Sequence, residues 1–325
     1  MSGPVEVDDA PLEPVGPARA DGGVDADASP SEPQLVELLE GRRAQVGSLE
    51  VRRVLPRRVR RTVGAWCFAD HMGPVPVTEH EGVEIGPHPH MGLQTVTWLV
   101  AGEVLHRDSL GSEQVVRAGQ LNLMTAGRGV AHSEENTGSY HGDLHGIQLW
   151  VAQPESTRNA PPAFEHHPEL PRVELDGAVL TVVVGELAGS ASPARRDTDH
   201  IGADLALRPP GATLPLRSRY EHALVVLEGR VTVDGSTVVP GVLGFLGRGR
   251  DECRLEVDAP ARAMLLGGVP FPEPLLMWWN FVARDEEEVS VARREWSERA
   301  DRFGTVRSSL DRLEAPVPVW ERAES

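Results

Sequence analysis

Two short histidine patterns in the chain could hold a metal ion. His88 and His90 form an H-x-H pair, and further along the chain His132 and Glu134 repeat the same spacing. On an extended strand, residues i and i+2 project to one face, so each pair can direct both side chains at a single ion. Three neutral imidazoles and one carboxylate would leave two positions open on a six-coordinate divalent metal, for substrate or dioxygen.

The four side chains can meet only if neighbouring strands carry them. From Leu35 onward, short runs rich in Val, Leu and Thr alternate with Gly, Asn and Asp, as in TVTWLV, EVLHRD and GIQLWVAQ. Such runs are typical of antiparallel strands in a sandwich or barrel. The sequence therefore predicts an all-β fold in which the two pairs converge inside a small barrel.

Two halves of the chain look like a degenerate repeat, separated by a proline-rich connector at residues 153–172. WLVAGEV (98–104) aligns with VVLEGRV (225–231), and AGQLNLMTAG (118–127) aligns with PGVLGFLGRG (240–249). Duplication of one all-β unit is the simplest explanation of this pattern.

The repeat also tests the metal hypothesis within the chain. The alignment places Pro215 and Arg217 at the positions of His88 and His90, and it places Arg254 and Glu256 at those of His132 and Glu134. Because arginine side chains repel a cation, we expect one ion per chain, in the first half.

The residues around the two pairs resemble a known family. Gly82-x5-His88-x-His90 and Gly129-x2-His132-x3-Asn136 follow the two halves of the cupin signature. The longer segments PHPHMGLQTVTWLVAGEVLHRDSLG, RAGQLNLMTAGRGVAHSEEN and HGIQLWV resemble the pirin family of bicupins, over roughly residues 48–275. A closing EPLLMWWNFVARDEEEV is similar to the C-terminal region of that family.

The resemblance implies a cofactor and an activity. In pirins the metal, usually iron, is held at the positions of His88, His90, His132 and Glu134, and all four residues are present here. This ligand set also accepts Ni, Mn, Cu, Co or Zn. Pirins resemble quercetin 2,3-dioxygenases, which implies a flavonol-like enol and dioxygen as substrates, with Glu134 as the catalytic base. The alternative is a metal-containing regulatory protein, a transcriptional or metabolic co-regulator that binds a protein partner.

The resemblance is not complete. Four positions after His90 most cupins and pirins carry a glutamate, where this chain has Gln94. We expect the metal site to survive, with a weaker outer-shell role for that side chain. His106 is expected to be a core or rim histidine rather than a ligand, and His145 and Gln148 are expected to face the pocket. The following histidines occur in turn-rich stretches and are expected to be solvated: His71, His80, His141, His166, His167, His200 and His222.

These patterns predict an all-β fold with two double-stranded β-helix (cupin, jelly-roll) domains and a C-terminal helix. Residues 1–34, rich in acids, Pro and Gly, are expected to form a disordered tail. Residues 35–160 should form the N-terminal cupin domain with the metal site, and residues 161–325 the C-terminal cupin domain without one. Within residues 285–303, apolar residues at spacings of three and four predict an amphipathic helix that covers the second domain.

The overall charge excludes some partners. The chain has 325 residues and a net charge of −17, which argues against direct binding to nucleic acid or to an anionic membrane. It shows neither a signal peptide nor an apolar run long enough to span a membrane. Two cysteines do not make a disulfide framework, so a reducing, cytoplasmic location is expected.

Overall fold

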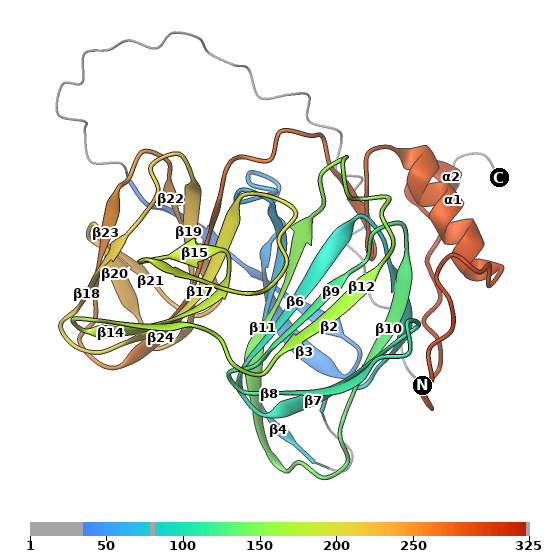
Figure 1. Cartoon of the computed structure of the whole chain (residues 1–325), viewed down its shortest axis with the longest axis horizontal. Helices are drawn as coiled ribbons and strands as arrows, with labels where there is room; N and C mark the ends of the chain where they lie inside the picture. The colour runs from blue at the N-terminus through green and yellow to red at the C-terminus, as the bar shows by residue number, and fades with distance from the viewer. Residues whose placement is uncertain (1–34, 79–81, 323–325) are drawn as a thin grey trace, which may run out of the picture.

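The computed structural model describes residues 35–78 and 82–322, which form two β-rich halves side by side (Figure 1). The predicted acidic tail, residues 1–34, lies outside the described residues. Strands make up most of the regular structure, and the helices in the described part are α1 (Glu286–Ser297) and the short α2 (Val319–Arg322). The prediction of a mostly β fold with two cupin domains is confirmed.

The first half consists of two sheets. The larger, seven-stranded sheet has the order β12-β9-β6-β11-β4-β3-β2, and the smaller, four-stranded sheet has the order β5-β10-β7-β8. The strands are β2 (Arg42–Val46), β3 (Leu49–Leu55), β4 (Trp66–Val77), β5 (Ile85–His90), β6 (Leu93–Ala101), β7 (Glu103–Asp108), β8 (Glu113–Arg117), β9 (Leu121–Thr125), β10 (Val130–Glu135), β11 (Gly142–Ala152) and β12 (Ala163–His167).

The second half repeats this arrangement. Its sheets have the orders β1-β22-β19-β24-β17-β14-β13 and β18-β23-β20-β21. The strands are β1 (Glu37–Glu40), β13 (Arg172–Leu175), β14 (Ala178–Val184), β17 (His200–Leu207), β18 (Gly211–Pro215), β19 (Glu221–Glu228), β20 (Val231–Val233), β21 (Ser236–Val238), β22 (Val242–Gly247), β23 (Glu252–Glu256) and β24 (Ala261–Gly268). Two short hairpins complete the set: β15 (Glu186–Leu187) with β16 (Ser190–Ala191), and β25 (Leu276–Trp278) with β26 (Phe281–Ala283). Strand for strand, the two orders match, as a duplicated unit requires.

The two halves exchange their edge strands. β1 precedes the first half in the chain but pairs antiparallel with β22 of the second. β12 follows residue 160 but pairs with β9 of the first. The predicted domain boundary between residues 160 and 161 therefore separates β12 from the sheet to which it is hydrogen-bonded. It also assigns β1 to the first domain, although β1 pairs with the large sheet of the second.

The backs of the two large sheets pack against each other. Val96 and Trp98 of β6 share one apolar cluster with Val184 of β14 and Val225 of β19. The indole Nε1 of Trp66 donates to the carbonyl oxygen of Ile201 across the interface, at 2.9 Å. Since β-strands alternate their faces, the opposite face of the first sheet points into its own barrel.

The C-terminal segment lies on the first half, beside β10 (Figure 1). Helix α1 begins at its N-cap Asp285, whose carboxylate accepts from the backbone N–H of Glu288, and the first turn is acidic as the helix dipole favours. Its predicted apolar face, including Val289 and Trp296, packs on Met91 and Ala131, next to the histidine pairs. The prediction that this helix covers the second domain is wrong, because its apolar face is buried in one cluster with Met91, Ala131 and Phe281 of β26, on the first half.

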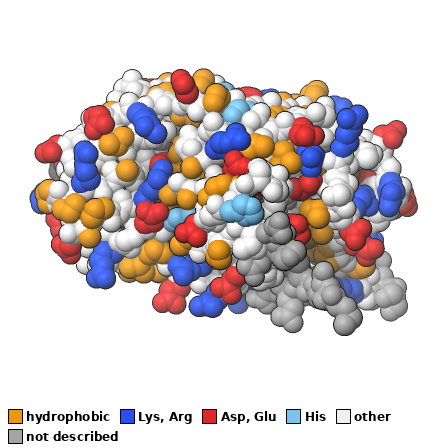
Figure 2. Space-filling model, turned by 90° about the horizontal axis from the view of Figure 1, so that it is seen from below, with side chains coloured by type: hydrophobic (Ala, Val, Ile, Leu, Met, Phe, Trp, Pro, Cys, Tyr) orange, Lys and Arg blue, Asp and Glu red, His pale blue; other side chains and the backbone are white. Residues whose placement is uncertain are grey.

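Charge is distributed without a dominant patch on the face shown in Figure 2, where arginine and acidic side chains are interspersed. None of the helices in residues 35–78 and 82–322 has the length and apolar composition that a membrane crossing requires. Cys67 and Cys253 are both buried and free, in agreement with the expectation of no disulfide.

Candidate metal centre

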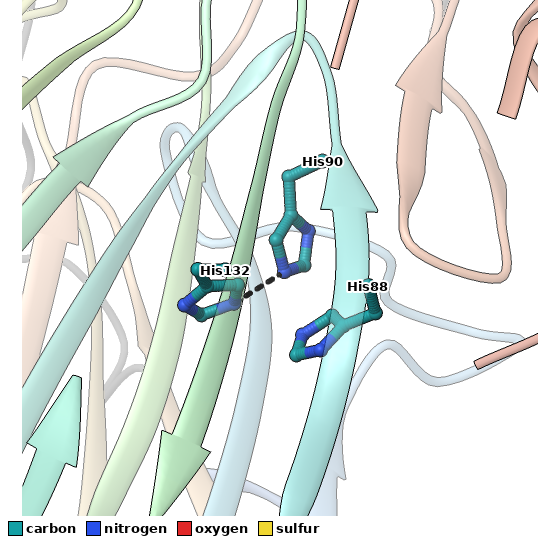
Figure 3. A group of neighbouring side chains, drawn as sticks. All are labelled: His88, His90 and His132. Atoms are coloured by element: carbon teal, nitrogen blue, oxygen red, sulfur yellow. Dashed lines mark hydrogen bonds between the residues drawn. The ribbon is translucent and has the colours of Figure 1, made fainter. Parts of the chain in front are cut away.

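The three histidines of the two patterns meet inside the first barrel (Figure 3). β5 and β10 are antiparallel neighbours, and their register places His132 opposite His88. One ligand nitrogen from each of His88, His90 and His132 lies within 4.8 Å of the others. All three side chains are buried, with at most 6% of their surface exposed. The three histidines of the two patterns therefore converge in one buried group.

The hydrogen bonds of these rings define which nitrogen can bind a metal. His88 Nδ1 lies 2.9 Å from the carbonyl oxygen of Gly86, and His90 Nδ1 lies 3.1 Å from that of Asn280. Because a carbonyl only accepts, both Nδ1 atoms must carry the proton, which leaves both Nε2 atoms with a free lone pair.

His132 completes this arrangement. Its Nε2 lies 3.0 Å from His90 Nε2, while its Nδ1 points the other way, 3.4 Å from His106 Nδ1. If His132 is protonated on Nδ1 like the other two, two lone pairs face each other at 3.0 Å, a contact that a cation between them would stabilise. Burial lowers the pKa of His88 to about 4 and the pKa values of His90 and His132 well below the usual range, so the rings are neutral at neutral pH. The residues present therefore fit a divalent metal.

Glu134 lies on β10, the strand of His132, but its carboxyl group is not part of the compact group formed by the three histidine nitrogens. Its carboxyl group is buried and accepts a hydrogen bond from Thr97 of β6. Burial raises the pKa of Glu134 to about 7, against the opposing effect of the Thr97 hydrogen bond. The structure thus presents a three-histidine site with a buried carboxyl group beside it, and a fourth-ligand role for Glu134 stays a prediction.

A polar row crosses the wall of the large sheet that faces Glu134. Thr97 is the cross-strand neighbour of Gln148 on one side and Asn122 on the other, and Gln148 in turn neighbours Asp70. The Oε1 atom of Gln148 and the Nδ2 atom of Asn122 are buried without a protein partner. Gln148 faces the interior, as predicted. Sequence reasoning missed Thr97, Asn122 and Asp70, although their alternation with the apolar residues of the back face was the available signal.

Aromatic rings form the rest of the surroundings. The ring of Trp150 meets His90 edge-on at 5.1 Å between centroids, and Phe68 stacks on Trp150 at 4.0 Å. Phe164, from the exchanged strand β12, stacks on His106 at 4.5 Å. Flat apolar surfaces therefore lie directly beside the histidine group.

Comparison with known proteins now identifies the family. The Pirin family model matches residues 48–151, and the model of the pirin C-terminal cupin domain matches residues 203–304. The chain is a member of the pirin family. It is 44% identical over 307 residues to a Pseudomonas aeruginosa protein named "Putative quercetin 2,3-dioxygenase", an alignment that covers 93% of this chain and 97% of that protein. A pirin-like protein of Caulobacter vibrioides is 36% identical over 80% of this chain and 92% of its own length.

Solved structures agree with this assignment. A crystal structure titled as quercetin 2,3-dioxygenase from Acinetobacter baumannii has a TM-score of 0.85 and 41% identity, and it covers 87% of this chain and 96% of its own. A bacterial pirin from Escherichia coli, solved in complex with nickel(II), shares the fold at a TM-score of 0.58 and 20% identity, over 73% of this chain and all of its own.

Two residues expected near the pirin site lie elsewhere. His145 is on the back face of β11, where its Nε2 lies 2.9 Å from His71 Nε2 and its Nδ1 lies 3.1 Å from a carboxylate oxygen of Glu228 in the second domain. Gln94 shares the back face of β6 with Val96 and donates to the hydroxyl of Thr125 at 2.9 Å. The prediction that His145 faces the pocket is wrong, because the alternation of β11 turns it towards the domain interface.

Three other histidines expected to be solvated are buried: His71, His200 and His222. The regions that looked like turns in the sequence are strands β4, β17 and β19 in the structure. Burial lowers the pKa of His200 and His222 to about 4, so both are neutral members of the β framework.

Among the described residues, the second barrel shows no counterpart of the three-histidine group. Arg254, aligned with His132 by the sequence repeat, is exposed on the outer face of β23. The inward positions of β18 and β23 are held by Leu214, Cys253 and Leu255, all within the apolar core of that barrel. The inward positions of these strands therefore carry apolar side chains and not the arginine that the repeat aligned with His132.

Proposed function

We propose that this pirin is a metal-dependent dioxygenase of the quercetinase type, which acts on a flavonol-like enol with dioxygen as co-substrate. The observation that carries the proposal is the buried three-histidine group, with the buried Glu134 carboxyl on the same strand as His132. The names of relatives at 44% and 41% identity support it. Iron is the metal that the family resemblance favours, and His88, His90 and His132 would hold it, with Glu134 as a fourth ligand or as the base.

In this proposal Glu134 removes the enol proton. Its carboxyl group is already buried, so it need not lose a shell of water when the substrate enters. The Thr97 hydroxyl donates to the carboxylate and fixes the oxygen that receives the proton. The metal, when bound, supplies the Lewis acidity that stabilises the ionised enol oxygen.

The other walls suit a flat polyphenol. Stacked or edge-on contacts with Phe68, Trp150 and Phe164 would hold aromatic rings beside the histidines. The unpartnered amide atoms of Gln148 and Asn122 offer one acceptor and one donor to its hydroxyl groups. A substrate that lacks either rings or hydroxyls would use only part of this surface.

The test measures dioxygen consumption by metal-loaded protein with a panel of flavonols. Glu134→Gln keeps the shape of the side chain but removes the base, and turnover should fall by about 10²–10⁴-fold, the usual contribution of a general base. Glu135→Gln is the matched control, because Glu135 lies on the same strand but its carboxylate is bound by Arg107 at 2.6 Å. Its turnover should equal that of the wild type.

Two results would contradict the proposal. Turnover that persists in Glu134→Gln would remove Glu134 from the reaction. No dioxygen uptake by fully loaded wild-type protein with any flavonol would favour the alternative, a metal-containing regulator that acts through a protein partner.

A further inference from the structure

Each metal-facing histidine has a different partner on its Nδ1 atom. His88 and His90 use main-chain carbonyls, which no side-chain substitution can remove. His132 instead faces His106, and His106 faces Asp108, on the neighbouring strand β7. The register of β10 against β7 creates this contact, because it places His132 opposite Asp108 and Glu134 opposite His106.

The direction of the hydrogen bonds that link His132, His106 and Asp108 follows from the contacts of Asp108. One carboxylate oxygen of Asp108 accepts from the backbone N–H groups of Leu110 and Ser112, both at 2.9 Å. The other oxygen lies 3.2 Å from His106 Nε2. With one oxygen bound by two backbone N–H groups, the Asp108 carboxylate is held as an acceptor, and His106 donates to the other oxygen from Nε2.

The position of the proton on His106 also determines the direction of its hydrogen bond with His132 in the metal site. In the tautomer with its proton on Nε2, His106 has a lone pair on Nδ1, and this lone pair accepts from His132 Nδ1 at 3.4 Å. His132 is then left with its lone pair on Nε2, the atom that faces His90. Phe164 stacks on the His106 ring and holds its plane, and both His106 and Asp108 are at least 96% buried.

We propose that His106 and Asp108 are positioning residues that fix the tautomer and orientation of His132 and thereby strengthen metal binding. Outer-shell partners of this kind typically change metal affinity by about 10–100-fold. The inference rests on the three-histidine site alone and is independent of the reaction proposed above.

The experiment compares two substitutions of His106. His106→Leu fills the space but can neither accept from His132 nor donate to Asp108. His106→Gln can do both, through its carbonyl oxygen and its amide N–H groups. A third variant, Asp108→Asn, keeps the size of the side chain but removes the charge. His222→Leu is the control, because His222 is equally buried but lies in the second domain.

Two readouts are measured for each variant. Long-range ¹H–¹⁵N spectra of the metal-free protein report the tautomer of His132, and titration with Co²⁺ reports affinity and the visible absorption spectrum of the site. We expect a mixed tautomer and about 10–100-fold weaker Co²⁺ binding in His106→Leu and a smaller loss in Asp108→Asn. His106→Gln should be close to the wild type, and His222→Leu should match it.

The proposal is overturned if His106→Leu keeps both the Nδ1-protonated His132 and the wild-type Co²⁺ affinity. It is equally overturned if the Gln and Leu variants behave alike, because His106 would then act only by filling space. The His132 tautomer is read without metal, so it tests the pair even for a variant that binds Co²⁺ too weakly to measure.

Discussion

The two barrels of this pirin share one strand order but differ in what fills them. The first carries buried His, Glu, Asn and Thr side chains on its interior face, while the second is packed with Val, Leu and Ala. In the second barrel, β18 and β23 correspond to β5 and β10. Their inward-pointing side chains are Leu214, Cys253 and Leu255. The same topology thus supports either a reactive centre or a solid core, depending on the side chains that point inward.

The outer faces of the two small sheets also differ. In the first barrel every residue of β5 and β10 is buried, since the C-terminal segment covers their outer side. In the second barrel, β23 alternates between exposed and buried residues. Burial of polar side chains in the first barrel costs stability. The same barrel is the one whose metal-binding strands, β5 and β10, are covered on their outer side by the C-terminal segment.

The largest expected effect is a loss of bound metal on substitution in the first barrel but not at the aligned position of the second. His132→Ala should lower metal affinity by more than ~100-fold, because loss of an outer-shell partner alone costs about 10–100-fold. Arg254→Ala, at the position that the sequence repeat aligns with His132, should leave the content at one ion per chain. Elemental analysis after dialysis measures both. Stoichiometric metal in His132→Ala would place the ion elsewhere in the chain.

The next effect concerns stability. Leu255 is 1% exposed in the core of the second barrel, and Leu255→Ala should lower the free energy of unfolding by about 2–5 kcal/mol, without loss of metal. Urea unfolding measures the change. Its exposed neighbour serves as the control, since Glu256→Ala should stay within about 0.5 kcal/mol of the wild type. A loss of metal in Leu255→Ala at low urea would show that the two barrels are coupled more closely than their separate cores suggest.

Acid should destabilise both barrels of the metal-free protein. The folded pKa values of His88 and His222 are lowered to about 4 by burial, so between pH 6.5 and 4 the unfolded state binds more protons than the folded state. The free energy of unfolding should therefore fall as the pH falls through this window, by about 1.4 kcal/mol per pH unit for each such histidine. Unfolding at a series of pH values should show a shallower slope for His222→Gln. The exposed His141→Gln is the control, and an equal slope in all three proteins would contradict the assignment.

The smallest effect is expected at Gln94. Because it lies on the back face, with its Oε1 atom buried and unpartnered, Gln94→Leu should leave Co²⁺ affinity unchanged. The free energy of unfolding should change by less than about 1.5 kcal/mol, the net value of the one hydrogen bond lost. A large drop in affinity would mean that this position acts on the metal through the sheet.

The sequence was sufficient for the fold and for the core of the site. The period of two in a strand makes His88, His90 and His132 converge once β5 and β10 are neighbours, so the spacing predicted the group together with the family resemblance, which implies that pairing. The docking surface of α1 could not be predicted, since an amphipathic pattern shows that a face is apolar but not which surface covers it. The alignment of Arg254 with His132 also placed an outward residue at an inward position, because a constant offset ignores irregularities such as the one between His132 and Glu134.

The exchange of edge strands has a consequence for how the protein is made. β1 leaves the ribosome early, but its partner β22 begins about 200 residues later, a delay of roughly 10–40 s at 5–20 residues per second. The carbonyl group of Asn280, which accepts from His90, emerges later still. His90 therefore gains the carbonyl partner of its Nδ1 atom only after residue 280 has been synthesised, although the three histidines themselves lie within the first 132 residues.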